Sequence, residues 1–171
     1  ELLSDLSLSS DSAVAFDSYQ PNGFNLVLPI PSTGNISLGT ITLVSENIEV
    51  LGGTLSLAGG SSVGANGELE VGGSGTLSLQ GDLTVTGTLD LEDGASLTLA
   101  GNTLDISGGQ LDLAGTHSLD GITTGANTTL QINSSANISR TGSGTNTVGN
   151  LVLSQAGSSS GVSFGVDNMS L

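Results

Sequence analysis

The fold is decided by a short stretch of sequence, LTVTGTLDL at residues 83–91 followed by GASLTLAG at residues 94–101. It consists of apolar-polar-apolar triplets separated by glycine-containing turns. Alternation with a period of two is typical of a half-buried β-strand. Similar triplets recur from Ile36 onward without any helical periodicity, so the sequence predicts an all-β protein.

The triplets recur at a nearly constant interval. One series has its first residues at Ile48, Leu69, Leu89, Leu111, Leu130 and Leu151, at steps of 21, 20, 22, 19 and 21. A second series begins at Leu55, Leu77, Leu97 and Leu119, and a third contains Leu83 and Leu104. Three interleaved series with one period indicate three strand-forming faces per coil, each coil stacked on the previous one. We therefore predict a single-stranded β-solenoid, a three-faced β-helix with about 20 residues per coil.

Two features bear on this architecture. The glycine pairs Gly52-Gly53, Gly72-Gly73 and Gly108-Gly109 are expected to supply corners with positive φ, which glycine adopts without strain. An up-and-down barrel or a jelly roll would also show frequent turns. Strands of such folds need longer alternating runs than the triplets found here, and this favours the solenoid.

The repeat divides the chain into two parts. Residues 36–171 are predicted to form the solenoid, and residues 1–35, which lack the repeat, to form an N-terminal cap or a subunit-linking segment. An uncapped stack exposes unpaired strand edges to which further strands can be added. The candidate assembly residues lie near the two ends of the chain: Phe24, Leu26, Leu28, Ile30, Val162 and Phe164.

The charge balance excludes several partners. Sixteen acidic residues against one basic residue give a formal net charge of −15, which disfavours binding to nucleic acid or to an anionic membrane. No apolar run is long enough to span a membrane. The chain begins at Glu1 without methionine, as a secreted protein does after removal of its signal peptide, although a trimmed chain would look the same. We expect a secreted protein at a cell surface.

One outward-facing column is acidic. The middle residues of successive triplets in the first series are Glu49, Glu70, Asp90 and Asp112. Carboxylates at strand spacing repel one another, so they either extend into solvent or bind a hard cation such as calcium. Calcium is the one possible cofactor, and the calcium-binding nonapeptide repeat is absent.

No catalytic constellation is recognisable. His117 and Arg140 are the only residues of their types, lack patterned partners, and are expected at the surface or in turns. Sugar-cleaving β-helix enzymes need basic residues or carboxylates beside aromatic platforms, which are scarce here, so we expect no enzyme activity. Threonine pairs at residues 40–42 and 84–86 do not extend into the flat array of an ice-binding surface.

The repeats at residues 83–91 and 94–101 resemble those of bacterial surface β-helix proteins, namely autotransporter passengers and filamentous-haemagglutinin-like adhesins. The resemblance covers about residues 36–155. It implies an exported, surface-associated bacterial protein and carries no catalytic motif. We expect a structural protein that assembles end to end with copies of itself into a filament or rod. The alternative is a monomeric adhesin stalk that binds a surface or host glycan.

Overall fold

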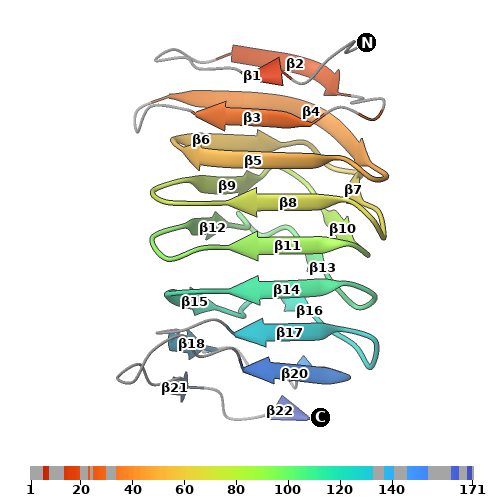
Figure 1. Cartoon of the computed structure of the whole chain (residues 1–171), viewed down its shortest axis with the longest axis vertical. Helices are drawn as coiled ribbons and strands as arrows, with labels where there is room; N and C mark the ends of the chain where they lie inside the picture. The colour runs from red at the N-terminus through yellow and green to blue at the C-terminus, as the bar shows by residue number, and fades with distance from the viewer. Residues whose placement is uncertain are drawn as a thin grey trace.

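The computed structural model describes residues 6–7, 14–19, 23, 25–29, 34–132, 137–140, 146–153, 163–165 and 169–170. Within these residues there is no helix, hence none able to cross a membrane, and every strand pair is parallel. Figure 1 shows the strands stacked along the long axis, with the two termini at opposite ends. The predicted β-solenoid is confirmed, with about 21 residues per coil.

The first face, sheet A, is one sheet of eight strands. In pairing order they are β1 (Leu6–Ser7), β3 (Leu26–Pro29), β5 (Asn47–Gly52), β8 (Glu68–Val71), β11 (Thr88–Leu91), β14 (Gln110–Leu113), β17 (Thr129–Ile132) and β20 (Asn150–Leu153).

The second and third faces share a nine-stranded sheet, because the long strand β4 (Asn35–Leu43) turns the corner between them. The second face contains β2 (Val14–Tyr19), β4, β6 (Thr54–Leu57), β9 (Thr76–Leu79) and β12 (Ser96–Thr98). The third face contains β4, β7 (Ser61–Val63), β10 (Leu83–Val85), β13 (Leu104–Asp105) and β16 (Ile122–Thr123). Two smaller sheets consist of β15 (Thr116–Ser118), β18 (Asn137–Ser139) and β21 (Ser163–Gly165), and of β19 (Asn146–Thr147) and β22 (Met169–Ser170).

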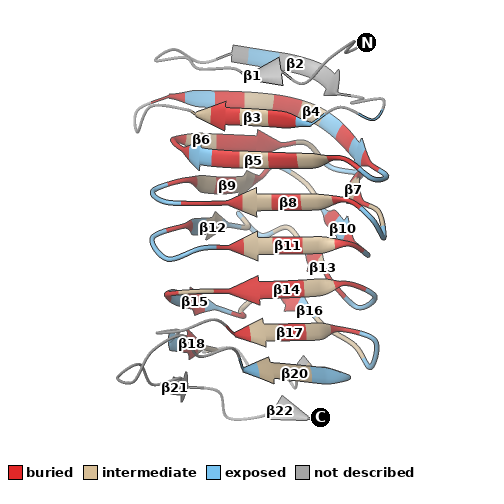
Figure 2. Ribbon diagram, in the orientation of Figure 1, coloured by how far each residue is buried: buried red, intermediate tan, exposed pale blue. Residues whose placement is uncertain are grey.

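The register follows the sequence repeat on the first face. The first residues of the first series, from Ile48 to Leu151, pair with one another strand by strand. Leu83 pairs with Leu104 on the third face, as the third series predicts. The inward side chains form a continuous core of Leu, Ile and Val, and buried and less buried residues alternate along the strands (Figure 2). This alternation is the physical origin of the triplets.

The second series was predicted one step too far. Leu55, Leu77 and Leu97 pair in turn, but β12 is the last strand of its sheet. In the next coil β15 pairs with β18 instead, and its buried residue is His117. Leu119 is buried in the core as the series predicts, at 1% exposed, but it lies after β15 and not in a strand paired with Leu97. The second face is therefore interrupted between β12 and β15, and we call the part of the second face around this interruption the broken face.

Glycine has two roles at the corners. Gly53 and Gly73 have φ of 60° and 58°, as expected for the second residue of the first two glycine pairs. The prediction was wrong for Gly108-Gly109, neither of which has positive φ. Gly109 is required by close approach, because a Cβ atom there would lie 2.6 Å from the carbonyl oxygen of Val85 in the previous coil.

The stack extends into residues 1–35. Leu26 pairs with Ile48, and Leu6 pairs with Leu26, so β1 and β3 continue sheet A beyond the recognisable repeat. The sequence did not reveal this because a single run bounded by prolines does not establish a period. The cap or linking role of this segment stays a prediction.

Candidate functional site

The acidic column predicted from the repeat forms a ladder on the outer side of sheet A. Glu49 pairs with Glu70, Glu70 with Asp90, and Asp90 with Asp112, each on an adjacent strand. The acidic ladder ends at uncharged side chains, since Val27 precedes Glu49 and Gln131 follows Asp112 in the register. Four carboxyl groups are thus held at strand spacing.

The surroundings of Glu70, Asp90 and Asp112 oppose ionisation of these carboxyl groups. Burial, followed by the charges of Asp112, Glu70, Glu92 and Glu68, raises the pKa of Asp90 to about 7. The pKa of Glu70 is raised by burial and by neighbouring carboxylates. Burial also raises the pKa of Asp112, although the Gln110 side-chain amide donates a hydrogen bond of 2.9 Å to its Oδ1 atom. Asp90, at the centre of the ladder, is therefore still partly protonated near neutral pH.

A dedicated metal centre would need convergent ligands. A hollow of about 400 Å³ beside the ladder is lined by Gly73, Asp90, Glu92, Asp93 and Ala114. In the described part of the chain, however, no three His, Asp or Glu side chains are grouped so that they could hold a metal ion. The carboxylates of the ladder follow one another in a line, which offers a cation a charged surface rather than a coordination shell.

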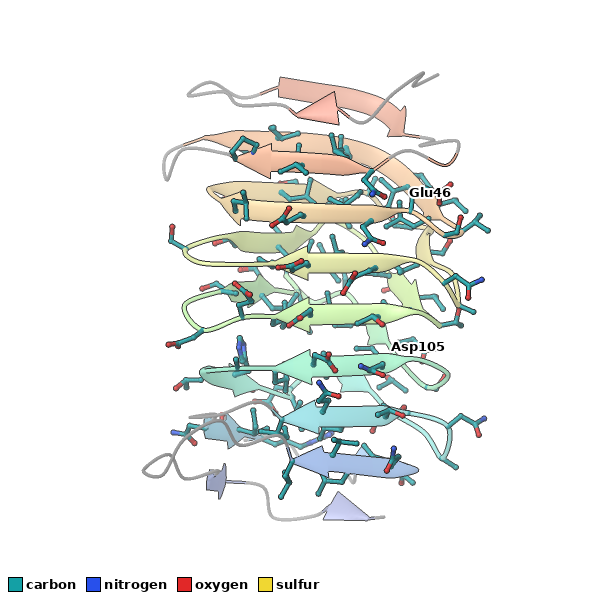
Figure 3. All side chains as sticks on the ribbon, viewed as in Figure 1. Glu46 and Asp105 are labelled. Carbon is teal, nitrogen blue, oxygen red and sulfur yellow. The ribbon has the colours of Figure 1, made fainter. Side chains whose placement is uncertain are left out.

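A carboxylate that the sequence reading missed lies at a corner. Glu46 is 6% exposed and sits at the turn between β4 and β5 (Figure 3). Its Oε2 atom accepts hydrogen bonds from the backbone N–H groups of Val44 (2.7 Å) and Ser45 (2.9 Å), and its Oε1 atom accepts one from Gly23 (2.8 Å). Burial alone would raise the pKa of Glu46, but these hydrogen bonds outweigh it and lower the pKa. Glu46 thus ties the N-terminal segment to the stack.

The candidate assembly residues have different positions. Leu26 and Leu28 are 1% and 0% exposed, and they complete the inward face of the chain's own sheet A. Phe164 lies in β21, opposite Ile138 of β18. Phe24, Ile30 and Val162 lie outside the described residues.

The last strand of sheet A is an open edge in the described residues. β20 pairs with β17 on one side and has no strand on the other. Leu153 pairs with Ile132, but Ile132 is fully buried whereas Leu153 is 56% exposed. An inward apolar column therefore continues to the last strand of sheet A and becomes accessible there.

The broken face contains the other unexpected residue. We expected His117 at the surface or in a turn, and this was wrong, since it is 7% exposed. Its Nε2 atom donates a hydrogen bond of 2.6 Å to the carbonyl oxygen of Ala114, which satisfies a polar atom at an inward position. A hollow of about 370 Å³ opens beside it, lined by Leu97 and Leu99 of the preceding coil.

Arg140, also expected at the surface or in a turn, directly follows β18 and is partly buried. Burial of the only Arg in the chain could not be read from sequence, because no partner residue recurs with it.

Comparison with protein-family models, with curated proteins and with solved structures finds no match for this chain. Its fold is a parallel β-solenoid.

Proposed function

We propose that this chain is a non-enzymatic, extracellular structural protein of a bacterial surface that assembles end to end into a filament or rod. The observation that carries the proposal is the open edge of sheet A. Because all strands of sheet A run parallel, its first strand, β1, and its last strand, β20, present complementary edges. Simple translation of a second copy along the axis would continue the sheet.

The contact would be heterologous and would not close on itself, so it would produce a filament rather than a ring. Backbone hydrogen bonds to the open edge of β20 would fix the orientation of the added copy. Burial of Leu153, which is 56% exposed, would contribute roughly 1 kcal/mol per contact. The net charge of −15 disfavours lateral aggregation of such rods.

Extracellular location and bacterial origin rest on the resemblance of the repeats to autotransporter passengers and filamentous-haemagglutinin-like adhesins. The absence of an enzymatic role is proposed from composition, because one basic residue and 2% aromatic residues leave few groups for sugar chemistry. Calcium would stabilise the rod by neutralising the acidic ladder.

Negative-stain electron microscopy at several protein concentrations tests assembly. Filaments with an axial repeat near the length of one solenoid are expected. Leu153→Asp should abolish them, because a carboxylate would be placed at the docking edge. Leu51→Asp is the matched control, since Leu51 is 46% exposed in β5, away from both ends of sheet A.

Dispersed short particles of the wild-type protein under every condition would refute end-to-end assembly. The second candidate function, a monomeric adhesin stalk that binds a surface glycan, would then be preferred. The hollows beside His117 and Arg140 favour it, because they interrupt an otherwise regular surface.

A further inference from the structure

Arg140 is the single Lys or Arg residue of the chain, and its guanidinium group is incompletely satisfied. Its Nε and Nη1 atoms are buried and have no hydrogen-bond partner among the described residues. Buried donors of a charged group are normally paired, and an unpaired one calls for a ligand, an ion or water.

A hollow of about 530 Å³ lies against this side chain. Leu99 and Ile122 provide an apolar part of its lining, and Asn102, Thr103 and Thr123 provide polar groups. The hollow adjoins the one beside His117, because Leu99, Asp120 and Ile122 line both. We call the hollow against Arg140 the Arg140 groove.

One polar group of the groove is held in place. The Nδ2 atom of Asn102 donates hydrogen bonds of 2.9 Å to the carbonyl oxygens of Leu79 and Leu99. Both amide hydrogens are thereby used, and the Oδ1 atom remains as a fixed acceptor for a hydroxyl group. A cation, a fixed acceptor, two threonines and an apolar surface are therefore present together.

We infer that the Arg140 groove binds an acidic sugar, whose carboxylate pairs with Arg140 and whose ring lies over Leu99 and Ile122. A carboxylate suits the planar guanidinium donors. Asp120 in the lining and the net charge of −15 make a singly charged group less unfavourable than a doubly charged phosphate. The hydroxyl groups and the apolar ring face of a sugar match the mixed lining. The inference does not depend on end-to-end assembly.

The unique arginine makes the test specific, because the side chain gives one Nε–H signal in a nitrogen-proton correlation spectrum. Sodium glucuronate should shift this signal saturably, with a Kd on the order of 1 mM. Glucose, which has the ring but no carboxylate, should leave the signal unchanged. Acetate, which has the carboxylate but no ring, should require at least tenfold higher concentration.

Absence of a saturable shift with glucuronate would overturn the inference, and so would equal affinities for glucuronate and acetate. In Arg140→Met, the glucuronate-dependent shifts of the Gly121 and Thr123 amides should be lost. Gln131→Met, which places the same side chain on sheet A, should retain them. Retention of the shifts in Arg140→Met would also overturn the inference.

Discussion

Neutralising the centre of the acidic ladder should stabilise the protein, and Asp90→Asn is the substitution that tests this. Asp90 lies between Glu70 and Asp112 in the register, with Glu68 and Glu92 close enough to act on it. Burial and these charges raise its pKa from 3.8 to about 7. The folded state therefore binds a proton more tightly than the unfolded state.

The sign of the pH dependence follows from this shift. Below pH 3.8 the carboxyl group is protonated in both states and carries no penalty. As the pH rises from 3.8 to about 7, the unfolded state ionises more readily than the folded state, and stability is lost progressively. Above that window the penalty is constant.

The free-energy cost of ionising Asp90 in the folded protein has an upper bound. A shift of this size corresponds to at most about 4 kcal/mol at 1.36 kcal/mol per pKa unit. Because the side chain is only partly buried, solvent screening reduces this, and we expect about 1–2 kcal/mol. For a chain of this length that corresponds to an increase in Tm of roughly 2–8 °C for Asp90→Asn at about pH 8.

Urea denaturation followed by far-ultraviolet circular dichroism at about pH 8 and about pH 5 measures both effects. Wild type should be more stable at the lower pH, and the gain should be smaller in Asp90→Asn. Asp93→Asn, an exposed position in the turn after β11, is the control and should behave like wild type. If Asp90→Asn is no more stable than Asp93→Asn at the higher pH, the charge of Asp90 does not destabilise the fold and the reasoning fails.

Three further predictions concern the corners and the cation dependence. Glu46→Gln should cost about 2 kcal/mol near neutral pH, because the charged acceptor of three backbone N–H groups is lost. Since the pKa of Glu46 is lowered, the difference from wild type should shrink in denaturant titrations as the pH falls below 4.5. Gly87→Ala should cost about 2–3 kcal/mol, because its Cβ atom would overlap the carbonyl oxygens of Gly64 and Gly67. Gly108→Ala, with 3.6 Å to the nearest atom, should be nearly neutral in the same urea assay. Calcium and magnesium should raise Tm equally in thermal melts against a chelator, because the ladder lacks grouped ligands, and a calcium-specific increase would instead indicate a dedicated site.

The sequence by itself determined which side chains face inward and how the coils stack. Strand alternation is local, and the spacing from Ile48 to Leu151 repeats often enough to establish a coil length. The acidic ladder follows directly, because the middle residue of a triplet points outward once its neighbours point inward.

Tertiary structure alone decided where this regularity ends. The second series predicted that Leu119 would begin the strand stacked on that of Leu97. Leu119 is buried, but the strand at that level is β15, whose buried residue is His117, with its ring held by the carbonyl of Ala114. Glu46 is buried because three backbone N–H groups from two separate segments converge on it. Arg140 reaches a hollow formed by a different coil. These positions depend on contacts between residues far apart in the chain, and no local pattern encodes such contacts.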